Sequence, residues 1–157
     1  MLRLFVDAAL RERASIPLDG DQAAWLGRVM RRRVGERLAV FNGTDGEWEA
    51  EIAALERGSG QAAVLQRLRP QTASPDIWLA FAPAKRSTGD LVVRQATELG
   101  VSRILPVIAE RSVVDRLNPV RLRRIAIEAA EQCERLDVPE IAPLAPLKDL
   151  LAGWPAT

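Results

Sequence analysis

The sequence predicts a mixed fold in two parts: a small antiparallel β-barrel over residues 1–71, then an α/β unit with a parallel sheet over residues 72–157. Three observations support this prediction. The first half holds short apolar runs separated by glycine turns, which is typical of a small barrel. Residues 69–75 have the prolines and small polar residues of a linker. Beyond them, strand-like and helix-like segments alternate, which indicates parallel strands joined by crossover helices.

In the first half, we expect strands at residues 2–6, 37–41, 47–52 and 62–68. The run at 47–52 alternates polar and apolar side chains, as a half-buried strand does. Asn42 to Gly46 is a strong turn signal, and residues 58–60 are a second one. A short helix is expected over residues 21–31, with Asp21 as its N-cap.

In the second half, we expect strands at residues 77–81 and 104–108 and a short third strand around Ile141. The helix after the first strand is expected to begin with Ser87 as its cap and Asp90 facing the first-turn amides, and to end at Gly100. One face of that helix is predicted to carry Val92, Ala96 and Leu99. A further short helix is expected at residues 147–151.

The clearest helix in the chain runs up to Pro139 and has a stripe predicted to be buried: Leu122, Ile125, Ala126, Ala129, Ala130 and Cys133. Cys133 is therefore expected to be an inert core thiol. Three parallel strands make a small sheet whose last strand is left as an open edge. We therefore expect the chain to be the N-terminal portion of a longer domain.

Composition limits the class of protein. The chain has 157 residues, 48% of them hydrophobic, which is enough for packed cores. No apolar run reaches the roughly 18–20 residues that span a bilayer, and the first residues do not resemble a signal peptide. These features predict a cytoplasmic protein without membrane association. With one cysteine and no histidine, neither a disulfide framework nor a zinc site nor histidine acid–base catalysis is expected.

The charge is balanced overall but uneven along the chain. The net charge is +1, yet five of the 22 basic residues lie within residues 28–37, against a single acid. They are Arg28, Arg31, Arg32, Arg33 and Arg37. Guanidinium groups suit phosphate contacts and stacking on bases, so this cluster is a candidate RNA contact. The alternative is a solvated helix end, where arginines are favoured by the helix dipole.

Charged residues are also expected at the carboxyl rim of the parallel sheet, where ligands of such sheets gather. The candidates are Lys85, Glu98, Arg111, Gln132 and Arg135. They either line a cleft that holds RNA and orients a flipped base, or form ion pairs with structural roles only. The four tryptophans, Trp25, Trp48, Trp78 and Trp154, are expected to be core residues rather than base-stacking platforms.

Several segments, in order along nearly the whole chain, resemble the RsmE-type 16S ribosomal RNA uridine-N3 methyltransferases of the SPOUT (trefoil-knot) class. The matching segments are Arg3-Leu4-Phe5-Val6, Gly27-Arg28-Val29-Met30-Arg31 with Gly35-Glu36, Phe41-Asn42-Gly43, Ala84-Lys85, Gln95-Ala96-Thr97-Glu98-Leu99-Gly100-Val101, Pro106, Glu110-Arg111-Ser112, Ala129-Ala130-Glu131-Gln132-Cys133-Glu134-Arg135 and Val138-Pro139-Glu140-Ile141.

The resemblance implies a PUA-like RNA-binding barrel followed by the N-terminal half of a SPOUT domain that works as a homodimer. It implies transfer of a methyl group from S-adenosylmethionine to N3 of a uridine in the 16S RNA of the small ribosomal subunit. The glycine-rich segments that build the knot and the cofactor pocket in that family are not found in residues 1–157, so the pocket is expected beyond Thr157. The expected RNA-binding residues are Arg3, Arg28, Arg31, Arg32, Arg33, Lys85, Arg111 and Arg135, with Glu98 and Gln132 orienting the cleft.

Two other hypotheses stay open at this point. A stand-alone RNA-binding module without catalysis, a barrel plus a half-domain, would also account for the early end of the α/β unit. An unrelated α/β enzyme that uses the parallel rim is less well supported, because no glycine-rich phosphate loop follows the strand at residues 77–81. No residue of the chain is identified as a catalytic base.

Overall fold

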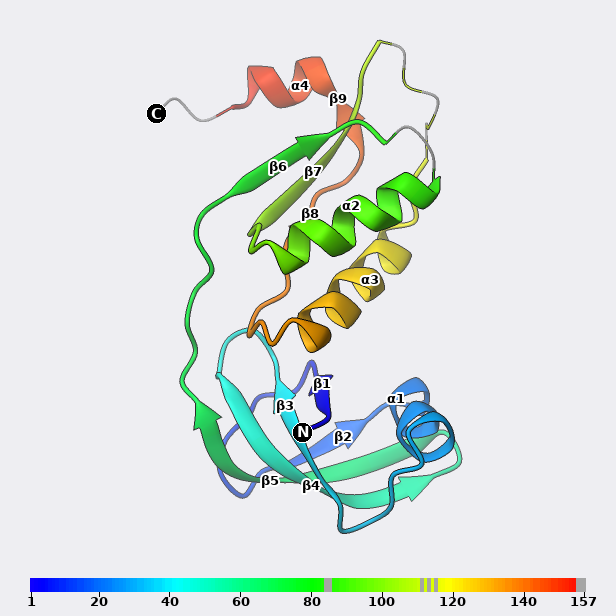
Figure 1. Cartoon of the computed structure of the whole chain (residues 1–157), viewed down its shortest axis with the longest axis vertical. Helices are drawn as coiled ribbons and strands as arrows, with labels where there is room; N and C mark the ends of the chain where they lie inside the picture. Colours follow the sequence, from blue (N-terminus) through cyan, green and yellow to red (C-terminus); the bar gives the residue numbers. More distant parts are fainter. Residues whose placement is uncertain (84–85, 111, 113, 115, 155–157) are drawn as a thin grey trace. The chain divides into compact units, whose positions relative to one another are not determined.

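The structure is a computed structural model that describes residues 1–83, 86–110, 112, 114 and 116–154 (Figure 1). The chain divides into two compact units, Met1–Ala73 and Ser74–Thr157. Among the described residues, no helix has both the length and the apolar character needed to cross a membrane.

The first unit is built on a five-stranded sheet. Its strands are β1 (Arg3–Phe5), β2 (Ser15–Leu18), β3 (Arg37–Phe41), β4 (Glu47–Glu56) and β5 (Ser59–Arg69), in the spatial order β1-β3-β4-β5-β2. Three of the four pairings are antiparallel, as expected, but β1 runs parallel to β3. The prediction of a wholly antiparallel unit was therefore wrong at β1. The chain returns to β3 only after β2 and a helical segment, so a hairpin cannot join β1 to β3.

Alternation along these strands builds the core of the first unit. Three register shifts between β4 and β5 bend and twist this long pair, as β-bulges do. The residues that then face inward are less than 6% exposed and apolar: Leu4, Val6, Leu10, Ile16, Leu18, Leu26, Leu38, Val40, Ala50, Ile52, Ala62 and Val64. The turn into β4 needs Gly46, whose φ is +86° and whose added Cβ would lie 2.4 Å from the carbonyl oxygen of Arg69.

The helical segment of this unit begins earlier than expected and changes type. It consists of α1 (Gly20–Ala24) followed directly by a π-helical turn, η1 (Trp25–Val29). Asp19, not Asp21, is the N-cap: its carboxylate accepts from the Gln22 amide at 2.8 Å, and the Gln22 side chain accepts from the Asp19 amide at 2.9 Å. This reciprocal pair is a capping box, and it places the N-cap two residues before the predicted N-cap.

The second unit is a parallel sheet with helices. Its elements are β6 (Trp78–Phe81), α2 (Arg86–Glu98), β7 (Arg103–Ile108), α3 (Pro119–Gln132), β8 (Glu140–Ile141), β9 (Ala145–Pro146) and α4 (Leu147–Ala152). Every recorded strand pair is parallel, with β7 between β6 and β8, and β9 pairs with the later part of β7. The sheet therefore has four strands instead of the expected three. Helices α2 and α3 pack against each other and against Ile104 of β7.

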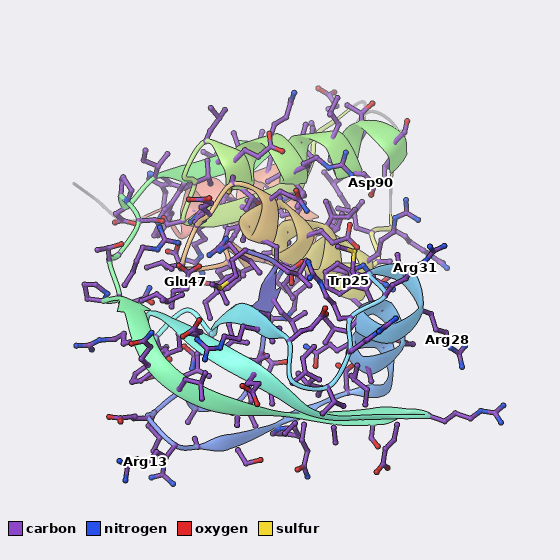
Figure 2. The ribbon with its side chains drawn as sticks, turned by 60° about the horizontal axis from the view of Figure 1, so that its bottom comes forward. Arg13, Trp25, Arg28, Arg31, Glu47 and Asp90 are labelled. Carbon is purple, nitrogen blue, oxygen red and sulfur yellow. The ribbon has the colours of Figure 1, made fainter. Side chains whose placement is uncertain are left out.

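Two helix predictions in this unit were wrong in detail. Ser87 lies inside α2, which starts at Arg86, and Asp90 accepts a 2.5 Å hydrogen bond from Arg121 of α3 instead of facing the first-turn amides (Figure 2). Leu99 is 80% exposed. The buried face of α2 carries Val93, Ala96 and Thr97 instead of the predicted Val92, Ala96 and Leu99. Thr97 can be fully buried there because its hydroxyl donates to the Val93 carbonyl at 2.8 Å.

The stripe on α3 was predicted correctly over most of its length. Leu122, Ile125, Ala126, Ala129 and Ala130 are buried. Cys133 is exposed, because the helix ends there and the residue becomes its C-cap. The predicted burial of that thiol was therefore wrong.

Candidate nucleic-acid interface

The arginine-rich segment comprises the last two residues of the π-helical turn and the loop that follows it. We call residues 28–36 the arginine loop; it carries four arginines and one acid, Glu36. Ahead of the loop, Ala23 and Leu26 are buried in the core of the first unit. The Gln22 side chain also donates to the Phe5 carbonyl at 2.9 Å, which ties the helix to β1. The loop therefore leaves a firmly anchored element.

Backbone hydrogen bonds hold the loop in one shape. The amide of Met30 donates to the Trp25 carbonyl at 2.9 Å, and that of Arg32 to the Leu26 carbonyl at 2.8 Å. Between these two residues the chain reverses at Arg31, whose φ is +53°. At its far end the loop is joined to β4, since the Gly35 amide donates to the Ile52 carbonyl at 2.9 Å.

The loop exposes most of its positive charge. Arg28, Arg31 and Arg33 are exposed, and Figure 2 shows Arg28 and Arg31 extending from the helical segment. Arg32 is half-buried, with Nη1 3.8 Å from the Glu36 carboxylate. Oε2 of Glu36 also accepts from the Arg33 amide at 3.0 Å. The acid is thus used to shape the loop, and a surface of three exposed guanidinium groups remains.

Arg3, also expected to bind RNA, is an interior residue. Its side chain is 8% exposed, and its Nε lies 2.5 Å from Oε1 of Glu47. Arg69 binds the other oxygen of Glu47 at 2.7 Å, and the Arg3 guanidinium lies 4.4 Å from the centre of the Phe41 ring. Burial raises the pKa of Glu47, but the hydrogen bonds from Arg69 and Arg3 outweigh it and hold the pKa below its usual value. Arg3 therefore balances a buried carboxylate.

Arg135 has a similar position in the second unit. Its side chain is 8% exposed; Nε donates to Asp137 at 2.7 Å, and Nη1 donates to the Thr97 carbonyl at the end of α2 at 2.9 Å. The Ser74 hydroxyl donates to the same carboxylate at 2.8 Å. Burial raises the pKa of Asp137, but the Arg135 and Ser74 hydrogen bonds prevail and lower it. This network joins the ends of both helices to the start of the unit.

The predicted convergence on the carboxyl rim of the sheet was wrong for three residues. Glu98 and Gln132 are the exposed last residues of α2 and α3, and Arg135 follows close behind. Both helices run antiparallel to the strands of the sheet, so their C-terminal ends lie at the amino edge of that sheet. At this edge the Ser102 amide donates a hydrogen bond to the Ile77 carbonyl at 2.9 Å. Lys85 and Arg111 lie outside the described residues.

Three apolar residues of the arginine loop were not singled out from the sequence. Val29 is 66% exposed, Met30 36% and Val34 59%. A regular helix over residues 21–31 would place Val29 and Met30 roughly on one side with Ala24 and Leu26, but the π-helical turn adds nearly a residue per turn and changes which way they face. No pattern in the sequence signals such a turn.

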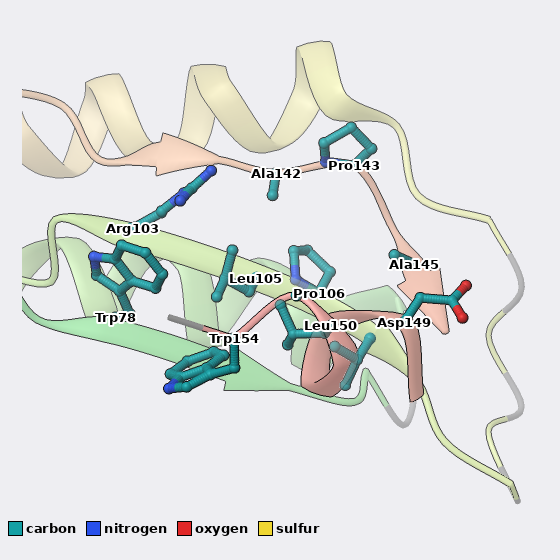
Figure 3. Close-up of a pocket in the computed structure, with 12 residues that line it drawn as sticks. Trp78, Arg103, Leu105, Pro106, Ala142, Pro143, Ala145, Asp149, Leu150 and Trp154 are labelled. Carbon is teal, nitrogen blue, oxygen red and sulfur yellow. The ribbon is translucent and has the colours of Figure 1, made fainter. Parts of the chain in front are cut away.

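A pocket in the second unit lies between β7, the β8–β9 connection and α4 (Figure 3). Its volume is about 580 Å³. Residues of β7 that line it include Arg103, Leu105 and Pro106. Trp78 and Trp154 also line the pocket, and their rings meet edge to face with centres 5.6 Å apart. Trp154 is 43% exposed and Trp78 is half-buried, so the prediction that both are core residues was wrong.

We tested whether this pocket suits S-adenosylmethionine, which carries a charged amino acid part and a polar adenosine. Tryptophan rings apart, only Arg103 and Asp149 bring polar side chains to its lining. Arg103 is already bonded to Glu140 at 3.2 Å. A cofactor of this kind needs several convergent polar groups, so the described residues do not fit it here.

A PUA domain followed by an RNA methyltransferase domain defines the class of this chain: the family model "RNA methyltransferase PUA domain" matches residues 18–65, and "RNA methyltransferase domain" matches residues 70–157. The second match covers more than half of the chain. The chain belongs to this RNA methyltransferase family, and curated relatives that it matches are named ribosomal RNA small subunit methyltransferase E.

Two such relatives show the extent of the match. The protein from Rickettsia conorii is 31% identical over 95% of this chain and 62% of its own length. That from Synechocystis is 34% identical over 85% of this chain and 44% of its own length. The chain thus spans about half to two thirds of the relatives it matches.

Solved structures agree with the fold. A ribosomal RNA small subunit methyltransferase E from Neisseria gonorrhoeae, bound to S-adenosyl methionine, matches 99% of this chain and 67% of its own length. The TM-score is 0.85 and the sequence identity is 28%. A probable rRNA-methyltransferase from Porphyromonas gingivalis matches 88% of this chain and 59% of its own, with a TM-score of 0.76 at 30% identity. Both parts of the predicted mixed fold, the PUA unit and the parallel-sheet methyltransferase unit, are confirmed.

Proposed function

We propose that this protein takes part in methylating small-subunit ribosomal RNA, with S-adenosylmethionine as the methyl donor and N3 of a uridine as the acceptor. The observation that carries the proposal is the arginine loop, a pre-shaped surface of exposed guanidinium groups on the PUA unit of a methyltransferase chain. The names of the relatives support the substrate, and the Neisseria structure supports the cofactor.

In this reaction, we propose that the described residues hold the RNA in position. N3 of uridine is hidden in base pairs, so the base must leave its stack before it can react. It must also lose its proton while the methyl group is held in line. S-adenosylmethionine supplies the methyl group when bound. The exposed arginines Arg28, Arg31 and Arg33 neutralise the RNA backbone and fix its position, and we assign no catalytic base to the described residues.

RNA contact is proposed to come from the arginine loop, including Arg32 through its half-exposed guanidinium. Arg3 and Arg135 are left out, since both side chains are 8% exposed and bonded to carboxylates. Glu98 and Gln132 are left out as cleft residues because they lie at the amino edge of the sheet. We further propose that the protein acts in the cytoplasm and is a homodimer, and that the first unit is a closed, PUA-like barrel.

The test is methyl transfer to small ribosomal subunits from a strain that lacks this modification. We expect the protein to bind these subunits, and labelled S-adenosylmethionine to mark a single uridine at N3. Sedimentation should show two copies per particle. RNA binding without any transfer would favour the alternative of a non-catalytic RNA-binding module, and no binding to small-subunit RNA would refute the proposal.

A further inference from the structure

The arginine loop carries apolar side chains in the open, between its charges. Val29, Met30 and Val34 are 66%, 36% and 59% exposed, in a unit whose other large aliphatic side chains mostly lie inside. In the sequence, Val29 and Met30 lie between Arg28 and Arg31, and Val34 follows Arg33. An RNA duplex presents phosphates and hydroxyl groups, which arginines alone can bind. Only an unstacked base presents an apolar face to such side chains.

The backbone gives a second, independent observation. Arg31 ends the helical segment with φ +53°, a left-handed conformation that is usually left to glycine or asparagine. A bulky residue held there destabilises the fold, and the Arg31 side chain is exposed, so it gains no burial in return. Arg13 and Glu134 have the same left-handed conformation, with φ of +63° and +61°, so the backbone at Arg31 marks a reversal that shapes the loop. The exposed guanidinium of Arg31, within the arginine loop, is what carries the inference.

The loop is also shaped before any RNA arrives. Its two ends are held by the Met30-to-Trp25 and Gly35-to-Ile52 hydrogen bonds, both 2.9 Å. A surface that is already ordered loses little conformational entropy on binding, which favours recognition of a particular shape.

We propose that the arginine loop binds unpaired nucleotides, with Val29 and Met30 against the face of an unstacked base and Arg28 and Arg31 on the adjoining phosphates. This proposal rests on the proposed function, since it specifies the kind of RNA that the same surface takes. It assigns to the PUA unit the selection of an open RNA segment over a paired one.

The experiment uses the full chain and two labelled RNAs with the same stem: one closed by an unpaired loop, and one fully paired. Fluorescence anisotropy at several salt concentrations gives the affinity and the number of phosphate contacts for each. We expect the looped RNA to bind about tenfold more tightly, the size of one unstacked-base contact.

Variants separate the apolar from the charged contribution. Val29→Ser with Met30→Ser should lower affinity for the looped RNA about fivefold and leave that for the duplex unchanged, while Met30→Leu should bind like the wild type. Arg31→Ala should reduce the salt slope by about one for both RNAs. Arg57→Ala, an exposed arginine in the β4–β5 turn, is the matched charge control and should change neither.

Arg31→Gly is the decisive variant. It removes the left-handed strain together with the guanidinium, so its thermal midpoint should match or exceed the wild type while RNA affinity falls. Unchanged affinity in Arg31→Gly, or equal binding of looped and paired RNA with no effect of the serine variants, would overturn this inference and leave the proposed function standing. A chain that binds neither RNA would overturn both.

Discussion

Glu47 should be the most sensitive charged residue of the first unit. Its carboxylate is 8% exposed and shared between Arg3 at 2.5 Å and Arg69 at 2.7 Å. Replacing it by Gln keeps the shape but leaves the guanidinium of Arg3 buried beside a neutral amide. Removing one partner of a buried ion pair typically costs about 3–5 kcal/mol. Since Arg69 is 40% exposed and can turn to water, we expect about 3 kcal/mol.

Urea unfolding followed by hydrogen exchange of β3–β5 amides measures this loss in the first unit separately. With a urea slope of about 2 kcal/mol per molar, the midpoint should fall by roughly 1.5 M. Glu51→Gln is the matched control, because Glu51 lies on the same strand and is only half-buried; its free energy of unfolding should stay within about 0.5 kcal/mol of the wild-type value. A Glu47→Gln midpoint equal to that of the control would refute the argument.

The same residue predicts a pH dependence. The pKa of Glu47 is lower in the folded chain than its ordinary value of 4.5. Its contribution is therefore fully present above that ordinary value and is lost as the pH falls through the lowered, folded value. The stability difference between wild type and Glu47→Gln should be constant at neutral pH and shrink below about pH 4.5. A difference that grows on acidification would show that the sign is wrong.

Three further outcomes are expected. Gly46→Ala should destabilise the first unit by about 3 kcal/mol or more, because Gly46 has φ +86° and an added Cβ would lie 2.4 Å from a backbone oxygen. Thermal unfolding measures this, and a loss under about 1 kcal/mol would contradict it. Arg135→Met should lower the stability of the second unit by about 2–4 kcal/mol. The double variant Arg135→Met, Asp137→Leu should lose less, since it leaves no partly buried carboxylate without its partner. Equal losses in the two variants would exclude this coupling. Native Cys133 should react with a thiol reagent without prior unfolding, and protection of the thiol until denaturation would contradict its exposed position.

Much of the fold was predictable because local patterns decide it. Period-two and helical periodicities located most strands and helices, and the glycine turns and the linker separated the two halves. The pairing of β1 with β3 was not predictable, since the direction of a strand depends on distant partners. The π-helical turn, the exposed Leu99 and the buried Thr97 were not predicted either. Thr97 can be buried because its hydroxyl donates to the Val93 carbonyl, and hydrophobic periodicity does not record such a hydrogen bond.

The candidate interface was predictable only in part. The sequence shows where arginines cluster, which located the arginine loop. It does not show which arginines meet a buried carboxylate, and so Arg3 and Arg135 were grouped with the RNA contacts although Glu47 and Asp137 engage them. The exposure of the apolar side chains of the loop was not predicted, because the sequence does not signal the π-helical turn at Trp25–Val29.

The tryptophans make each half of the chain separately visible to spectroscopy. Trp25 and Trp48 belong to the first unit, where both pack against its core, whereas Trp78 and Trp154 face each other in the second. Replacing either pair by phenylalanine leaves the remaining emission to report on a single unit. Two such proteins would show whether the units melt together or one after the other, and which of them a bound RNA protects.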